Sequence, residues 1–74
     1  MSQSFEHPEY GEIKKGDRFR IMITGMIGSY TAKVVDFDDI RGGTPILKVE
    51  NDETWPQLKN GDYIIQERIN AANN

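Results

Sequence analysis

The stretch Asp17-Arg-Phe-Arg-Ile-Met-Ile-Thr24 decides the fold class, because apolar and polar side chains alternate along it. Alternation with a period of two is the pattern of a β-strand that buries one face. The buried side would carry Phe19, Ile21 and Ile23, and the opposite side Arg18, Arg20 and Met22. The sequence therefore predicts a strand here with one face against a core.

The segments on either side continue the β pattern. Residues 30–37, 44–50 and 62–69 are rich in β-branched and aromatic side chains, and a short strand fits around residues 11–13. Glycine-containing turns separate these segments, and no helical period extends over ten residues. We expect an all-β domain of about five short antiparallel strands. Closure into a small barrel would remove exposed strand edges, and the alternative is an open sheet whose apolar face a partner or a second copy covers.

The ends of the chain differ from this middle. Residues 1–11 are polar and predict a flexible N-terminal arm, residues 12–70 form the β domain, and residues 71–74 predict a disordered tail. A length of 74 residues fits one domain. The chain has no cysteine, no secretory signal and no apolar run of the roughly 20 residues that span a membrane, so we expect a cytoplasmic protein without a membrane partner.

One short region resembles a known family. Lys15-Gly-Asp-Arg-Phe-Arg-Ile21, followed by Gly25 and Gly28, is similar to the start of a KOW motif. Within residues 15–36 there are two departures: Ser29-Tyr30-Thr31 replaces an expected glycine, and Met26 and Ile27 stand where the family usually has basic residues. The resemblance implies an SH3-like barrel that binds nucleic acid or protein and has no catalytic activity.

A meander built from these strands gathers positive charge on the outer face. Keeping the apolar side chains on one face fixes the pairing, because a slip by one residue turns every side chain over. In this register Arg20 lies opposite Lys33, and Val35 lies between Arg18 and Lys48. Like charges opposite one another cost a few tenths to about 1 kcal/mol, which an anionic ligand would relieve. The predicted basic binding face is Arg18, Arg20, Lys33 and Lys48, and its alternative is an ordinary solvated sheet face.

Four apolar side chains are hard to bury in this arrangement. Met26 and Ile27 fall at a hairpin tip, and Met22 falls on the polar side of its strand. Exposed apolar residues of this kind often mark protein interfaces. Trp55 is either a fourth interface residue or a plug at one end of the barrel. The predicted apolar interface is Met22, Met26, Ile27 and Trp55.

Catalytic and metal-binding chemistry lack the necessary groups. The single histidine, His7, lies in the expected arm beside Pro8 rather than near a nucleophile. Two acidic clusters, around residues 36–39 and 50–53, do not have the spacing of a calcium loop. We therefore predict a chain that is not an enzyme and that needs no cofactor or metal.

The expected function is binding. The first reading is a small interaction module that binds another protein as an accessory or inhibitory subunit, of the kind found among phage regulators. The second is a KOW-like nucleic-acid binder that uses the basic face. The third is a homo-oligomer that holds a small anionic ligand through the same residues. The sequence leaves open the partner, the oligomeric state, the order of the arm, and the choice between a closed barrel and an open sheet.

Overall fold

The computed structural model describes residues 4–70. These residues are all-β, apart from one short 3₁₀ turn, η1, that joins two strands. The elements in chain order are β1 (Ser4–His7), β2 (Gly11–Lys14), β3 (Arg18–Ile23), β4 (Tyr30–Asp38), η1 (Asp39–Arg41), β5 (Thr44–Val49) and β6 (Tyr63–Asn70).

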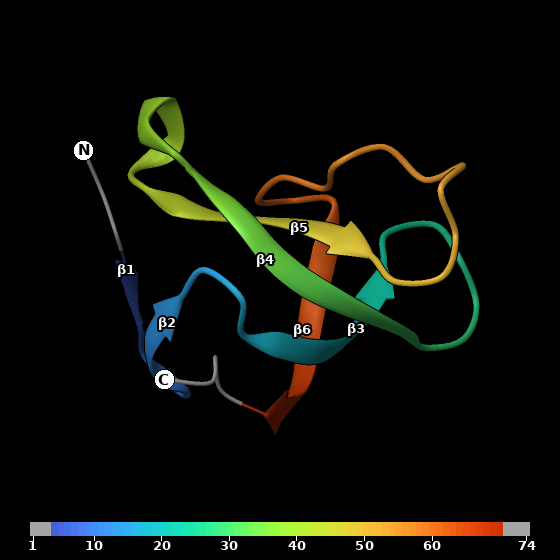
Figure 1. Ribbon diagram of the computed structural model, residues 1–74, viewed down its shortest axis with the longest axis horizontal. Helices are drawn as coiled ribbons and strands as arrows, with labels where there is room; N and C mark the ends of the chain where they lie inside the picture. Colours follow the sequence, from blue (N-terminus) through green and yellow to red (C-terminus); the bar gives the residue numbers. More distant parts are fainter. Residues whose placement is uncertain (1–3, 71–74) are drawn as a thin grey trace.

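The strands form two antiparallel sheets and no closed barrel within residues 4–70 (Figure 1). Strands β1 and β2 make a separate hairpin, and the other four make a sheet in the order β5-β4-β3-β6. The expected short strand at residues 11–13 is β2, and the four longer segments are strands within a few residues of their predicted bounds. Of the two arrangements left open by the sequence, the described residues have the open one.

The N-terminal segment differs from the expected flexible arm. Its described part, residues 4–11, includes all of β1, which pairs with β2 from Ser4↔Lys14 to His7↔Gly11. The physical reason is local: His7 Nδ1 accepts hydrogen bonds from the backbone N–H groups of Glu9 and Tyr10, at 3.0 and 3.3 Å, and closes the turn. The tail predicted for residues 71–74 lies outside the described residues.

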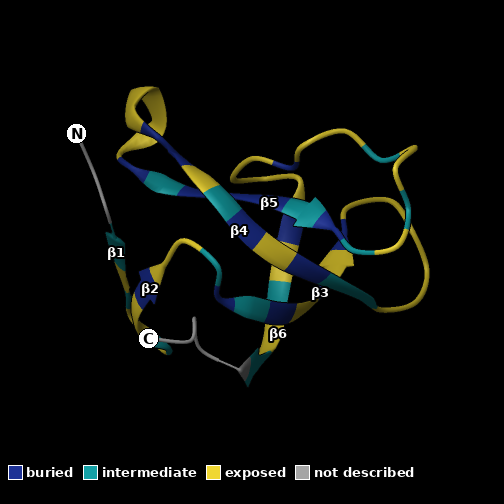
Figure 2. Cartoon of the chain, viewed as in Figure 1, coloured by how far each residue is buried: buried dark blue, intermediate teal, exposed yellow. Residues whose placement is uncertain are grey.

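The apolar side of the β3 stretch is the centre of the core, as the alternation predicts. Phe19 and Ile21 are fully buried, whereas Arg20 and Met22 are exposed (Figure 2). Strands β4 and β5 add Val34, Leu47 and their neighbours, and the hairpin adds Ile13. The buried apolar residues are Ile13, Phe19, Ile21, Ile23, Ala32, Val34, Phe37, Ile46, Leu47, Val49, Leu58 and Tyr63.

A buried ion pair attaches the hairpin to the four-stranded sheet. The Asp17 carboxylate accepts hydrogen bonds from Arg68 Nη1, at 2.9 Å, and from the backbone N–H of Lys14, at 2.8 Å. Arg68 Nη2 also donates to the carbonyls of Tyr10 and Glu12. One guanidinium on β6 therefore bonds to the backbone around the start of β2 and to the carboxylate that bonds to its end, and it lies 4.9 Å above the ring of Phe19.

Candidate functional site

The predicted basic face exists, but its register differs by two residues. The sequence placed Arg20 opposite Lys33, whereas the structure pairs Arg18 with Lys33 and Arg20 with Thr31. Lys33 in turn pairs with Lys48, which the sequence had placed opposite Val35. A shift of two leaves every side chain on its predicted face. Three cations, Arg18, Lys33 and Lys48, therefore form one row across β3, β4 and β5.

The turns explain the shift. The loop between β3 and β4 is centred one residue earlier than Met26-Ile27, because Ile21 pairs with Tyr30. Between β4 and β5 the register changes after Val34, where Val35 is an extra residue in a β-bulge. The bulge lets Val34 and Phe37 both face the core, although they are three residues apart in sequence. Simple alternation along β4 does not predict this irregularity.

Carboxylates neutralise two of the four predicted basic residues. Arg18 donates to both oxygens of Glu50, at 2.7 and 2.9 Å, and Arg20 Nη1 lies 2.6 Å from a carboxylate oxygen of Glu67. The hydrogen bonds from Arg18 hold the pKa of Glu50 below its usual range, with a smaller contribution from the charge of Lys33. The face is therefore less cationic than the sequence alone indicates.

The two lysines of the row border a shallow hollow. Its volume is about 440 Å³, and besides Lys33, Lys48 and Val35 it is lined by Glu50 and Glu53. Lys48 Nζ donates to the carbonyl of Trp55, and no ion pair is formed by either lysine within residues 4–70. The hollow thus combines two ammonium groups with two carboxylates, which favours a ligand of mixed charge over a polyanion.

The acidic loop clusters have structural partners. Asp36 Oδ1 accepts the backbone N–H of Phe37 at 2.9 Å, and Asp38 lies 3.6 Å from Arg41. Asp52 accepts the backbone N–H and the hydroxyl of Thr54, and these hydrogen bonds lower the pKa of Asp52. Within the described residues, no group of three or more His, Cys, Asp or Glu side chains is arranged to hold a metal ion.

Exposed apolar side chains occur on β3, in the loop that follows it and on β6. Met22 is more than a third exposed, Met26 is exposed in the loop, and Ile27 at the loop tip is 97% exposed. Met22 pairs across the sheet with Ile64 of β6, which is also exposed. We call Met22, Met26, Ile27 and Ile64 the apolar end.

Trp55 does not belong to this surface. Its ring packs edge-on against Tyr30, with the centroids 5.7 Å apart, and it is half-buried against the core. The sequence offered this packing role as the alternative to an interface role. The fourth residue of the apolar end is instead Ile64, which was not among the residues predicted from the sequence. The signal was present, because alternation along residues 62–69 puts Ile64 opposite Tyr63 and Ile65.

Within residues 4–70 no helix is long and apolar enough to cross a membrane. No model of a known protein family, no curated protein and no solved structure matches the chain. Inferences about function therefore rest on the residues and the geometry described above.

Proposed function

We propose that this chain is a non-catalytic protein-binding module whose partner covers the apolar end. The observation that carries the proposal is the exposure of Ile27 together with the cross-strand pair of Met22 and Ile64. Large apolar side chains on a small domain lose contact with water when a partner covers them, which makes such patches frequent interfaces. Methionine is also enriched at protein interfaces.

An accessory or inhibitory subunit is the role that we propose for this module. An SH3-like architecture related to the KOW family remains part of the proposal. Its support is the stretch Lys15–Ile21, in which Gly16 has a positive φ of 96° in the turn before β3. Catalysis is not part of the proposed role, because His7 is engaged in closing a turn.

A pair of matched variants tests the apolar end. Ile27 and Ile40 are both almost fully exposed, at 97% and 94%, but they lie in turns at opposite ends of β4. The experiment is a pull-down with the tagged full chain from lysate of its own source, with and without nuclease. The proposal predicts a protein that is retained by the wild type and by Ile40→Asp after nuclease treatment and lost with Ile27→Asp.

Retention of the same partner by both variants would overturn the assignment of the surface. Loss of every partner on nuclease treatment would overturn protein binding in favour of the second candidate. Because both isoleucines contact mostly water, neither substitution should change the midpoint of urea unfolding, which checks that the variants are folded.

The second candidate is nucleic-acid binding through the row of Arg18, Lys33 and Lys48. The row is the specific observation in its favour, because Lys33 and Lys48 lie on adjacent strands without a carboxylate ion pair within residues 4–70 and can each contact a phosphate. Such binding weakens steeply with salt, since each phosphate contact releases counterions. The affinity of a hydrophobic protein interface changes little between about 50 and 200 mM salt. Measuring affinity over this range of salt concentrations therefore separates the two candidates.

A further inference from the structure

Strand β6 is an edge strand with backbone groups that face outward. Within residues 4–70 it pairs with β3 alone. The opposite edge of the same sheet is partly covered, because Leu47 of β5 exchanges both backbone hydrogen bonds with Leu58, at 2.9 and 2.7 Å. Unpaired strand edges are templates for another strand, and proteins usually protect them. The outer edge of β6 has no such strand partner.

The hydrogen-bond pattern identifies the outward residues. Thr24 N donates to Asp62 O, so this pair faces across β3 and β6. Hydrogen-bonded pairs recur every second residue in an antiparallel ladder, which makes Met22 and Ile64 the next such pair. The backbone N–H and C=O groups of Tyr63 and Ile65 therefore point away from β3.

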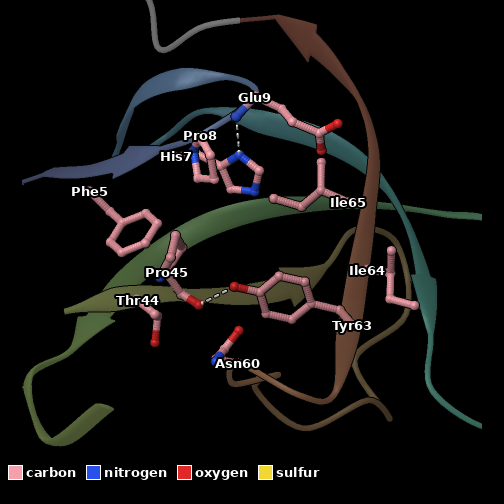
Figure 3. A pocket seen from close by; sticks show the side chains of 10 residues that line it. All are labelled: Phe5, His7, Pro8, Glu9, Thr44, Pro45, Asn60, Tyr63, Ile64 and Ile65. Carbon is pink, nitrogen blue, oxygen red and sulfur yellow. Dashed lines mark hydrogen bonds between the residues drawn. The ribbon is translucent and has the colours of Figure 1, made fainter. Parts of the chain in front are cut away.

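A hollow of about 380 Å³ lies along this edge, between β6, β1 and the start of β5 (Figure 3). Tyr63 and Ile65 reach from β6 toward His7 and Pro45, whereas Ile64 points to the other side of the strand. Three consecutive strand residues line the hollow although their side chains alternate in direction. This arrangement places the edge of β6 itself beside the hollow.

The residues that line the hollow, and the length of the free β6 edge beside it, determine what kind of ligand can bind there. Phe5, Pro45 and Ile65 supply apolar walls, and the Tyr63 hydroxyl is already bonded to Pro45 O at 2.6 Å. The single formal charge among the lining residues is the carboxylate of Glu9. The Tyr10 hydroxyl donates to Gln66 O at 2.9 Å, so the available edge ends before the bulge at that residue.

From these features we propose that a short extended segment of a partner protein adds to β6 at Tyr63–Ile65 as an extra strand. Its main chain pairs with the outward groups of Tyr63 and Ile65, which fit only an extended strand. One of its apolar side chains fills the hollow, and a neighbouring lysine or arginine faces Glu9. This site goes beyond the proposed apolar end: it borders that surface at Ile64 but uses the backbone edge of β6 and the hollow beside it.

Amide hydrogen exchange on the free chain is the first test. The amides of Tyr63 and Ile65 should exchange at least tenfold faster than the amide of Ile64, whose N–H bonds to β3. Equal protection of all three amides would overturn the proposal, because the edge would then already be occupied. A stable dimer in analytical ultracentrifugation together with that protection would identify a second copy of this chain as the occupant instead.

The second test uses a phage library that displays random octapeptides. Selected peptides should combine alternating apolar residues with a basic residue, and their binding should slow the exchange of Tyr63 and Ile65. A version of the best peptide with N-methyl groups on alternate amides should lose at least tenfold in affinity, because it lacks the donors for strand pairing. Failure to enrich any peptide would overturn the proposal.

Three variants assign the peptide to this site. Glu9→Lys should weaken the selected peptide at least tenfold, whereas Glu53→Lys, the same charge change on another surface, should alter its affinity less than twofold. Ile27→Asp should leave the peptide affinity unchanged, which separates this site from the apolar end. Equal binding by wild type and Glu9→Lys, with unchanged exchange at Tyr63 and Ile65, would overturn the proposal.

Discussion

At the scale of single residues, Tyr63 contributes both to the core and to the hollow beside β6. The residue is 9% exposed, and its hydroxyl on β6 donates to Pro45 O on β5. Burial of the hydroxyl raises the pKa of Tyr63 to about 12, and the nearby charge of Asp62 adds to the effect. A tyrosine in an unfolded chain loses its proton near pH 10.

The shift at Tyr63 predicts a loss of stability in alkali. Between pH 10 and about 12 the folded state keeps a proton that the unfolded state has lost, so the free energy of unfolding falls as pH rises. Below pH 10 this contribution is fully present. Urea unfolding at several pH values should show a fall that is steeper for the wild type than for Tyr63→Phe, by about 1 kcal/mol per pH unit. Parallel curves for the two proteins would contradict the assignment.

At the scale of elements, the row across β3, β4 and β5 has an energetic cost. Lys33 lies between Arg18 and Lys48, and like charges in cross-strand pairs are unfavourable. Lys33→Thr removes the central charge and introduces a better strand former. We expect the free energy of unfolding to rise by about 0.5 kcal/mol at low salt. This gain should shrink at about 1 M salt, because the charges are then screened.

Lys59→Thr is the matched control for that substitution. Lys59 is exposed in the loop before β6, outside the row, so its removal takes one positive charge from an acidic chain without relieving a cross-strand pair. Its effect on the urea midpoint should be neutral or slightly destabilising. A loss of stability with Lys33→Thr at low salt would show that attraction to Glu50 outweighs the repulsion within the row.

The elements also show what the sequence can and cannot predict. Alternation along residues 17–24 placed Phe19 and Ile21 in the core and Met22 outside, because side-chain direction depends only on the parity of position. Register depends instead on loop geometry and bulges, and the extra residue Val35 has no distinct sequence signal. Strand β1 and its pairing with the predicted strand β2 were missed, because β1 is short and the turn between them depends on a histidine cap.

The ion pairs on the basic face could not be predicted, because they also depend on the strand register and on which strands are neighbours. The bidentate pairing of Glu50 with Arg18 depends on the true register. Glu67 reaches Arg20 from β6, a strand that is distant in sequence and was not placed in the predicted meander. The sequence therefore placed these side chains on one face of the sheet and overestimated the net positive charge of that face.

At the scale of the whole molecule, the two sheets pack around one core. A small number of polar contacts also join the β1–β2 hairpin to the four-stranded sheet. Asp17 is 2% exposed, and Arg68 is the cation that faces it from β6 while also bonding to the β2 carbonyl of Glu12. A buried carboxylate that loses its cation is left with a large desolvation cost. Arg68 thus links the position of the hairpin to the stability of the four-stranded sheet.

Arg68→Met tests this link, because it keeps much of the side-chain volume and removes the charge. We expect a loss of about 3–5 kcal/mol in the free energy of unfolding, a large share of the total for a domain of this size. Arg20→Met is the control, since the Arg20–Glu67 pair is about half exposed and such pairs contribute about 1 kcal/mol or less. Similar urea midpoints for the two variants would show that the hairpin is held by apolar packing of Ile13 rather than by the ion pair. If Arg68→Met is unfolded outright, Arg68→Lys, which retains a charge without the fork of donors, should be folded, with faster amide exchange in β1 and β2 than in β4.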